Sequence, residues 1–400
     1  MTFGGRTRLV TALGIAQTLA WASSYYLPAV LAAPMARDLG VSTPTVFAAF
    51  SVALIVSALL GPKAGAAIDR LGGRPVLMGT SLVFAARLAA LGMAQGPVGL
   101  FAAWALLGIG MGSGLYEAAF AALVRVYGNG SRGPITGITL IAGFASTVGW
   151  PLSTFLEASS GWREACFTWA ALHLVVGLPL NTLLPRVPGP DVAMAAPPDI
   201  AVAGDASKTS LRATLALSFV FAATWFISTA MAAHLPRLLQ ASGATLGTAV
   251  LVGALIGPSQ VGARLLEFGL LRKVHPLLSA RIATALHPLG VAVLVVFGAP
   301  AAALFGILHG AGNGILTIAK GTLPLVIFGP QGYGHRQGLL MVPARIAQAL
   351  APWLFGLALD RWGSGALAVS ATVGSLAFFA LFLLPHAGPP PATSAAQPAP

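Results

Sequence analysis

The sequence contains very little charge and almost no cysteine. Only 8% of its 400 residues are Asp, Glu, Lys or Arg and 56% are hydrophobic, whereas an ordinary soluble domain is about 25% charged. This is too little charge for the water-exposed surface of a soluble protein, and we therefore expect a membrane protein. The single cysteine, Cys166, excludes a disulfide framework and any multi-cysteine metal site. We therefore expect no metal site and no cofactor.

Acidic residues are also scarce, with ten Asp and Glu against 22 Lys and Arg, which gives a net charge of +12. Such an excess would suit a nucleic-acid-binding protein if the cations formed one patch. They lie instead in short segments between apolar runs, so we exclude nucleic acid as a partner. The sequence also has no HExxH motif, no Walker motif and no paired carboxylates within an apolar run, which argues against an enzyme.

The apolar residues form twelve runs that are long enough to cross a bilayer, for which a helix needs roughly 20 apolar residues. The first run follows Arg6 and Arg8, as in a signal peptide, but its length and the runs after it predict a retained helix. The sequence thus predicts an all-α membrane protein. The predicted spans are about 9–31, 44–64, 75–95, 98–126, 134–157, 163–184, 211–235, 245–268, 276–298, 300–327, 338–359 and 364–384.

The positions of Lys and Arg predict the orientation of these spans. With the N-terminus inside, fourteen fall on the cytoplasmic side, and only Arg37, Arg163, Arg237 and Arg361 fall outside. Both termini are therefore predicted to be cytoplasmic, in a multi-pass protein of the inner membrane.

A polar segment, 185–210, divides the spans six and six. It contains five Pro and three Asp and is predicted to be a flexible cytoplasmic linker. The predicted domains are an N-terminal six-helix bundle at 1–184 and a C-terminal one at 211–384. The Pro/Ala-rich tail, 385–400, is predicted to be disordered.

The two halves repeat each other at offsets of 196 to 201 residues. Gly110-x-Gly112-x-Gly114 matches Gly310-x-Gly312-x-Gly314, Gly61-Pro62 matches Gly257-Pro258, and Pro151 matches Pro352. Three matches in register predict two pseudo-symmetric bundles, as in secondary transporters built from parallel repeats.

The segment between the second and third spans, Gly65–Arg74, has the pattern G-x-x-x-D-R-x-G-x-R. In this position it resembles the loop motif of the major facilitator superfamily of secondary transporters, bacterial type, and the resemblance covers the whole chain. It implies two six-helix bundles and transport by alternating access. It also implies a conformational latch, whose acid pairs with basic partners and faces a helix N-terminus in the outward-open state. The latch residues would be Gly65, Asp69, Arg70, Gly72 and Arg74, with Arg125 as a candidate partner; topogenic charge alone is the competing interpretation.

The chain departs from the drug:proton antiporters of that family at two positions. Trp104 stands where their fourth helix has an arginine, and Trp150-Pro151-Leu152-Ser153-Thr154-Phe155 replaces the end of their fifth-helix motif, Gly-Pro-x-x-Gly-Gly. Both departures weaken an antiport assignment and slightly favour uptake.

Polar and aromatic side chains recur at helical spacing on the spans that the resemblance places around a central cavity. Span ten has the clearest stripe, with His309, Asn313, Thr317 and Lys320 on one face. For a single Ser, Thr or Asn, a hydrogen bond between helices is the competing interpretation. The substrate-binding candidates are Gln17, Trp21, Tyr25, Trp150, Trp225, Asn313, Thr317, Lys320 and Arg345.

Charged groups within the spans are the stronger signal, because each costs about 3 kcal/mol or more to insert. They are Arg87, Glu117, Arg281, Lys320 and Arg345, so the interior is cation-rich and favours an anionic solute. For Arg87 the competing interpretation is a structural ion pair, and for Arg281 it is a side chain that extends to the cytoplasmic face. Glu117 is either a salt-bridge partner of Lys320 or a protonatable coupling site, and His309 is the second coupling candidate. Gln260, Arg264 and Glu267 share a face of span eight near its predicted cytoplasmic end, which favours a gate or a copy of the latch over a binding site.

These features predict a transporter that moves a small organic solute, either an organic anion or a planar, vitamin-like or aromatic compound, with uptake slightly favoured. Proton-coupled efflux of drugs or toxic compounds is the alternative, and a membrane-embedded sensor is a more distant one. The expected partners are the solute, the lipid bilayer and protons as a coupling ion, and we expect a monomer.

Overall fold

The computed structural model describes residues 3–187, 204–270 and 274–385, which form helices and turns with no strand. The N-terminal half contains α1 (Phe3–Ala22), α2 (Pro28–Asp38), α3 (Thr43–Leu71), α4 (Gly73–Gly92), α5 (Gly96–Gly114), α6 (Tyr116–Tyr127), η1 (Gly128–Ser131), α7 (Arg132–Ala142), α8 (Ala145–Ser160), α9 (Trp162–Leu172), the π-helical η2 (His173–Gly177) and α10 (Leu178–Thr182).

The C-terminal half contains α11 (Gly204–Ala241), α12 (Leu246–Gly269), α13 (Pro276–Phe297), η4 (Ala299–Ala301), α14 (Ala302–Phe328), α15 (Tyr333–Trp362), η5 (Gly363–Gly365), α16 (Ala366–Ala380) and η6 (Leu381–Leu383). Residues 188–203 of the predicted linker and 386–400 of the predicted tail lie outside the described residues, as do Arg272 and Lys273.

The prediction of an all-α membrane fold is confirmed. Within the described ranges, nine helical stretches are long and apolar enough to cross a membrane. Two of them, Gly96–Ser160 and Tyr333–Leu383, each cover two predicted spans, and α1 with α2 covers the first predicted span. The count of twelve crossings and the side of the membrane on which the ends lie stay predictions.

Each half has its own buried apolar core. The largest cluster consists of residues between Leu9 and Leu184, joined by Leu325, Tyr333 and Ala349, and three further clusters lie between Ala213 and Leu384. Lipid tails are as apolar as these side chains, so close packing holds such cores together more than removal from water does. The exact domain boundaries stay a prediction.

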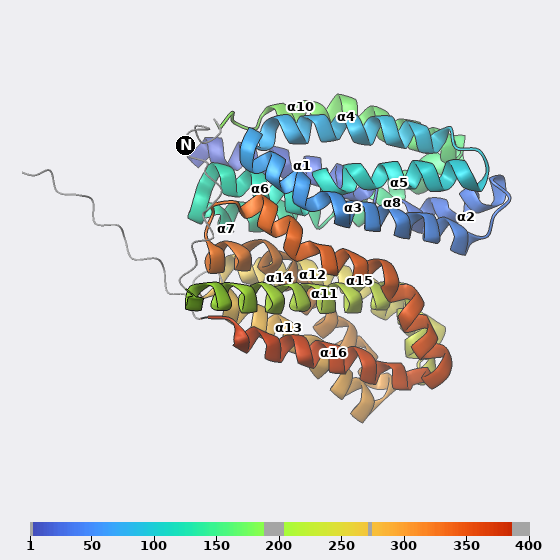
Figure 1. The fold of residues 1–400 in the computed structure, drawn as a ribbon. Coiled ribbons are helices and arrows are strands. Elements are labelled where there is room, and N and C mark those ends of the chain that lie inside the picture. Colours follow the sequence, from blue (N-terminus) through green and yellow to red (C-terminus); the bar gives the residue numbers. More distant parts are fainter. Residues whose placement is uncertain (1–2, 188–203, 271–273, 386–400) are drawn as a thin grey trace, which may run out of the picture.

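The two halves converge at one end and spread apart toward the other (Figure 1). They meet where α3 ends and α15 begins, and they diverge toward the end at which α2 lies. The converging end contains the segments that the distribution of Lys and Arg assigns to the cytoplasm.

Glycine pairs allow α3 and α15 to touch at the converging end. Gly61 and Gly65 are one turn apart on α3, and they face Gly334 and Gly338 on α15. A Cβ atom at Gly65 would collide with the backbone of Gly334, and one at Gly338 with the backbone of Gly61 and Pro62. Here the two halves therefore pack backbone against backbone, as small-xxx-small motifs allow.

Three spans that the sequence predicts as continuous helices are interrupted. Residues 23–27 separate α1 from α2, Leu115 separates α5 from α6 with φ −84° and ψ −167°, and Gly143 and Phe144 separate α7 from α8. Pro28 contributes to the first break because it lacks an N–H and restricts the preceding residue. In the described part of the C-terminal half, α11 to α15 run without such breaks, so the two halves differ in helix continuity.

Candidate functional site

An ion pair joins the two halves at the middle of the molecule. Glu117 lies in the first turn of α6, directly after the break at Leu115, where the helix N-terminus stabilises a carboxylate. Arg345 on α15 places Nη2 at 3.1 Å from Oε1 and 3.0 Å from Oε2 of Glu117. The salt-bridge partner of Glu117 is therefore Arg345 and not Lys320, the partner that the first of the two sequence interpretations named.

A hydrogen-bond chain extends this ion pair into the broken first span. Arg345 Nη1 donates to Gln348 Oε1 at 3.0 Å, and Gln348 Nε2 donates to the Tyr25 hydroxyl at 2.9 Å. A cavity beside Glu117 and Arg345 has a volume of only about 10 Å³, roughly what one water needs. The larger cavity, about 640 Å³, lies between α1 and α10 and touches none of the candidate site residues.

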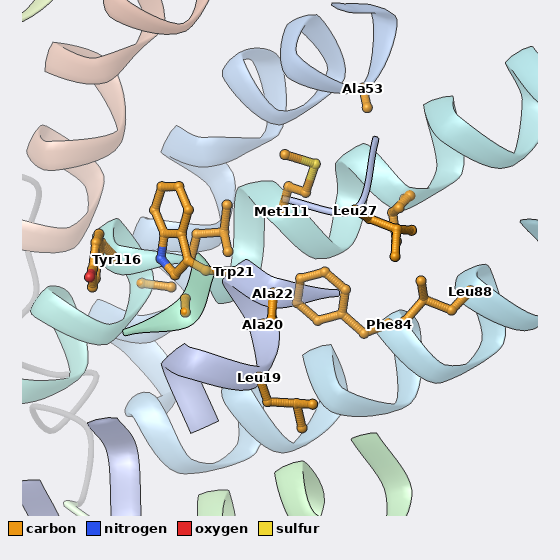
Figure 2. Close-up of a cluster of buried hydrophobic side chains, with 14 of the residues drawn as sticks. Leu19, Ala20, Trp21, Ala22, Leu27, Ala53, Phe84, Leu88, Met111 and Tyr116 are labelled. Carbon is orange, nitrogen blue, oxygen red and sulfur yellow. The ribbon is translucent and has the colours of Figure 1, made fainter. Parts of the chain in front are cut away.

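Aromatic rings surround the ion pair. Trp21 on α1 and Trp225 on α11 have ring centroids 6.4 Å apart and planes only 7° apart, although they belong to different halves. Tyr25, Tyr26 and Tyr116 pack on Trp21 with centroid distances of 5.2, 6.2 and 4.9 Å. Figure 2 shows Trp21 and Tyr116 close together in the buried cluster of the N-terminal half.

Two cations share the Trp225 ring. Lys320 Nζ lies 4.1 Å and Arg345 Cζ lies 5.4 Å from its centroid, and such cation–π contacts are strongest where water is excluded. Both cations are buried. The structure thus brings together six of the predicted site residues: Trp21, Tyr25, Glu117, Trp225, Lys320 and Arg345.

Arg264 on α12 belongs to the same group, although the sequence places it at a gate. Its Nη1 donates to the Thr139 carbonyl at 3.0 Å and its Nε to the Gly314 carbonyl at 3.5 Å, so it too links the two halves. Lys320 interacts electrostatically with Glu117, Arg345 and Arg264. The sequence indicated a polar face through Gln260, Arg264 and Glu267, but it did not indicate that Arg264 also interacts with Lys320.

The other candidates lie around this group. Gln17 Nε2 donates to the Gly114 carbonyl at 2.7 Å, which satisfies a backbone group at the break in span four. Thr317 donates to the Asn313 carbonyl, and Trp150, 45% exposed, packs on Tyr26.

His309 instead pairs with His287 on α13. Their Nδ1 atoms are 3.0 Å apart, and both rings pack near Phe305. These contacts do not connect His309 with Glu117. Sequence reasoning missed Tyr26, Tyr116 and Gln348, because their positions lie outside the stripes on which the candidates were chosen.

The loop motif contacts the other half at the converging end. Asp69 Oδ1 accepts from the Gly334 N–H at 3.0 Å, and Oδ2 accepts from the His335 N–H at 2.9 Å. These two N–H groups lie at the N-terminus of α15 and have no partner within that helix, and a carboxylate is favoured there. Gly72 ends α3 with φ +85°, a conformation that only glycine adopts easily. The latch role of these residues stays a prediction.

A second contact at the same end relates to the first through the internal repeat. Arg132, which begins α7, forms a 2.6 Å salt bridge with the buried Glu267 near the end of α12 and donates to the Val274 carbonyl. Glu267 follows Asp69 by 198 residues, within the offsets of the repeat. Each half thus presents an acid, near the end of its second long helix, to the start of a helix in the other half.

Comparisons with known proteins agree with this architecture. The family model of the Major Facilitator Superfamily matches residues 13–316. A relative from Thermoproteus tenax, an uncharacterized 38 kDa protein in the 23S RNA operon, is 29% identical over 359 residues, which are 88% of each chain.

Solved structures share the fold. The human organic anion transporter MFSD10 (TETRAN) has a TM-score of 0.65 at 18% identity, with 95% of this chain and 99% of that chain covered. The transporter FucP in the outward conformation has a TM-score of 0.71 at 13% identity, with 93% and 97% covered. A second structure, of the E. coli fucose:proton symporter FucP, has a TM-score of 0.67 at 14% identity over the same shares. At these identities the likeness shows the fold alone.

Proposed function

Because the chain belongs to the Major Facilitator Superfamily, a family of multi-pass membrane transporters, we propose that it carries a small organic anion together with a proton across the inner membrane. The two halves would open to each side in turn, as in other secondary transporters of this architecture. We expect it to work as a monomer.

The ion pair between Glu117 and Arg345 is the observation that carries the proposal. A single guanidinium nitrogen, Nη2, binds both oxygens of Glu117, so an incoming carboxylate competes with Glu117 for Arg345. Protonation of Glu117 removes its negative charge and weakens its hold on Arg345. Anion binding and proton binding therefore favour each other, and release of both restores the ion pair.

The surroundings of Arg345 support a planar solute. Trp21 and Trp225 present nearly parallel rings from opposite halves, and aromatic side chains stack readily on flat apolar groups. Lys320 and Arg345 lie over the same ring, so a carboxylate would find its cations next to a stacking surface. An aromatic carboxylate combines both properties.

The described conformation supports access from the diverging end. Asp69 and Glu267 both hold the converging end closed by contacts between the halves, and the cavity beside Glu117 and Arg345 is too small for an organic solute. If the termini are cytoplasmic, this conformation faces outward and the solute enters from outside. Trp104 and the changed motif at Trp150 favour uptake over drug:proton antiport.

Uptake into proteoliposomes tests the proposal. Radiolabelled benzoate, fucose and a cationic aromatic dye would be compared in vesicles with an alkaline interior. After subtraction of the flux into empty vesicles, we expect pH-driven uptake of benzoate only, lost in Arg345→Gln and retained in Arg281→Gln, a matched span arginine that binds the Leu381 carbonyl and the Phe382 ring. Absence of benzoate flux above empty vesicles contradicts anion transport, and proton-driven export of the dye favours efflux.

A further inference from the structure

The central group carries more positive charge than its ion pair neutralises. Lys320, Arg345 and Arg264 are only 4%, 3% and 5% exposed, and Lys320 interacts electrostatically with Glu117 and with both arginines. Three cations and one carboxylate leave a formal charge of +2. Within the described ranges, neither Lys320 nor Arg264 forms a salt bridge: Glu117 pairs with Arg345, and Glu267 pairs with Arg132.

Such a charge excess is costly inside a membrane protein. Buried ions need partners, and an isolated ion in a low-dielectric interior costs several kcal/mol or more. An arginine cannot escape this cost by losing its proton. The carbonyl groups of Thr139 and Gly314 stabilise Arg264 as dipoles, but they do not neutralise it. A negative charge from outside the chain would neutralise it.

The cations of the central group lie at two levels along α14, so they attract negative charge at two places. Arg264 bonds to the carbonyl of Gly314, and Lys320 follows six residues later, which is roughly 9 Å along a helix axis. Lysine side chains lean toward the helix N-terminus, which shortens this separation. Arg345 joins Lys320 at Trp225, whereas Arg264 interacts electrostatically with Tyr26 and Tyr116.

We infer that the transported anion carries two acidic groups on a rigid planar body, one group binding Lys320 and Arg345 and the other binding Arg264. The inference rests on the proposed function and names its substrate class, an aromatic dicarboxylate. Bound together with one proton on Glu117, a monoanion leaves the formal charge of the site at +2, whereas a dianion lowers it to +1. The second acid is the group that compensates Arg264.

The charge count also predicts an electrical signature. A monoanion that moves with one proton transfers no net charge, but a dianion that moves with one proton transfers one negative charge. An inside-positive potential, imposed with potassium and valinomycin, should therefore accelerate uptake of terephthalate and leave uptake of benzoate unchanged. This measurement uses only the wild-type chain, so it does not depend on a variant that folds.

Competition measurements test the site itself. In wild-type proteoliposomes, we expect terephthalate to inhibit the uptake of labelled benzoate at concentrations at least tenfold lower than unlabelled benzoate does. In Arg264→Gln this preference should disappear, so that the two acids inhibit at about the same concentration, and Arg264→Lys should retain part of the preference. Arg212→Gln, an exposed arginine on α11, is the matched control; thermal unfolding and size-exclusion profiles check that each variant is folded.

The outcomes separate the two proposals. Equal inhibition by benzoate and terephthalate in the wild type, or terephthalate uptake that ignores the potential, overturns the dianion inference and leaves anion transport intact. Failure to transport or bind either acid overturns the proposed function and the inference with it.

Discussion

At the scale of single residues, the account depends on how many partners Arg345 can satisfy at once. Its guanidinium binds Glu117 and Gln348 and lies near the Trp225 ring. The contact with Glu117 is one that a solute carboxylate can replace. When a solute carboxylate replaces Glu117 on Arg345, binding of the solute changes the surroundings of a titratable residue. That property makes the pair a candidate coupling device.

Replacing Glu117 by Gln tests this property. The amide resembles the protonated acid, so Arg345 should be free at every pH. We expect the apparent Kd for benzoate to change less with pH than in the wild type, and pH-driven accumulation to fall at least tenfold, while exchange of internal for external benzoate continues. Binding and flux would be measured in the same preparation.

Glu164→Gln is the matched control, since Glu164 is an exposed acid on α9 away from the site. It should behave like the wild type. A Glu117→Gln protein that still accumulates benzoate against its gradient would contradict the coupling role.

The candidate site could be predicted only in part from the sequence. Lys320, Trp225 and Glu117 stand out because charged and aromatic residues are rare in apolar runs. The partner of Glu117 is 228 positions away at Arg345, and helical periodicity does not reveal how two distant helices are rotated toward each other. The polar face of Gln260, Arg264 and Glu267 predicted a gate or a copy of the latch, and it did not reveal that Arg264 also interacts with Lys320.

At the scale of elements, close packing between α3 and α15 determines which end is closed. The glycines at 61, 65, 334 and 338 let the two backbones touch, and Asp69 then reaches the N-terminus of α15. The sequence indicated the loop motif, but not its partner. It also missed the break at Leu115, which is not marked by proline, whereas Pro28 was a readable signal for the break before α2.

Gly65→Ala should weaken this closed end. The added methyl group meets the backbone of Gly334, which cannot move as a side chain could, and overpacking of this kind costs about 1–3 kcal/mol. We expect a reactive probe to label a cysteine introduced at Ser57, beside the central cavity, at least fivefold faster from the converging end. Cys166 is fully buried and should not interfere.

Gly79→Ala is the control for that experiment. A Cβ at Gly79 on α4 has open space around it, and alanine favours a helix over glycine. The labelling rate should not change. Equal rates in Gly65→Ala and the wild type would mean that the α3 and α15 contact does not hold this end closed.

The salt bridge between Arg132 and Glu267 should act at the same end. Glu267→Arg places two arginines against each other where the wild type has a 2.6 Å ion pair, so transport should fall at least tenfold. Adding Arg132→Glu restores opposite charges and should recover much of the activity. A double variant as inactive as the single one contradicts a role for the pairing itself.

At the scale of the whole molecule, most buried apolar residues of each half pack within that half, and the halves contact each other through polar pairs and through the packing of α3 against α15. Such halves can rotate as units, because closely packed interiors resist deformation while interfaces change. The repeat and the apolar runs allowed this architecture to be predicted, since bilayer thickness fixes helix length. The divergence of the halves could not be predicted, because one sequence serves every state of a transporter.

Distances between spin labels can follow this motion. Ser42 and Ser364 lie at the diverging end, and Leu71 and Gln331 lie at the converging end. On addition of a transported acid, we expect the distance between Ser42 and Ser364 to shorten and that between Leu71 and Gln331 to lengthen. Distances that stay unchanged, or that change in the same direction, contradict alternating access between two units.

Proton uptake on anion binding is the most direct test of the central claim that one carboxylate replaces another on Arg345. The purified protein would be placed in weakly buffered solution near pH 7 with a pH indicator, and benzoate or terephthalate would be added to saturation. We predict net uptake of up to one proton per chain in the wild type and none in Glu117→Gln. Saturable binding of either acid to the wild type without proton uptake would contradict the account.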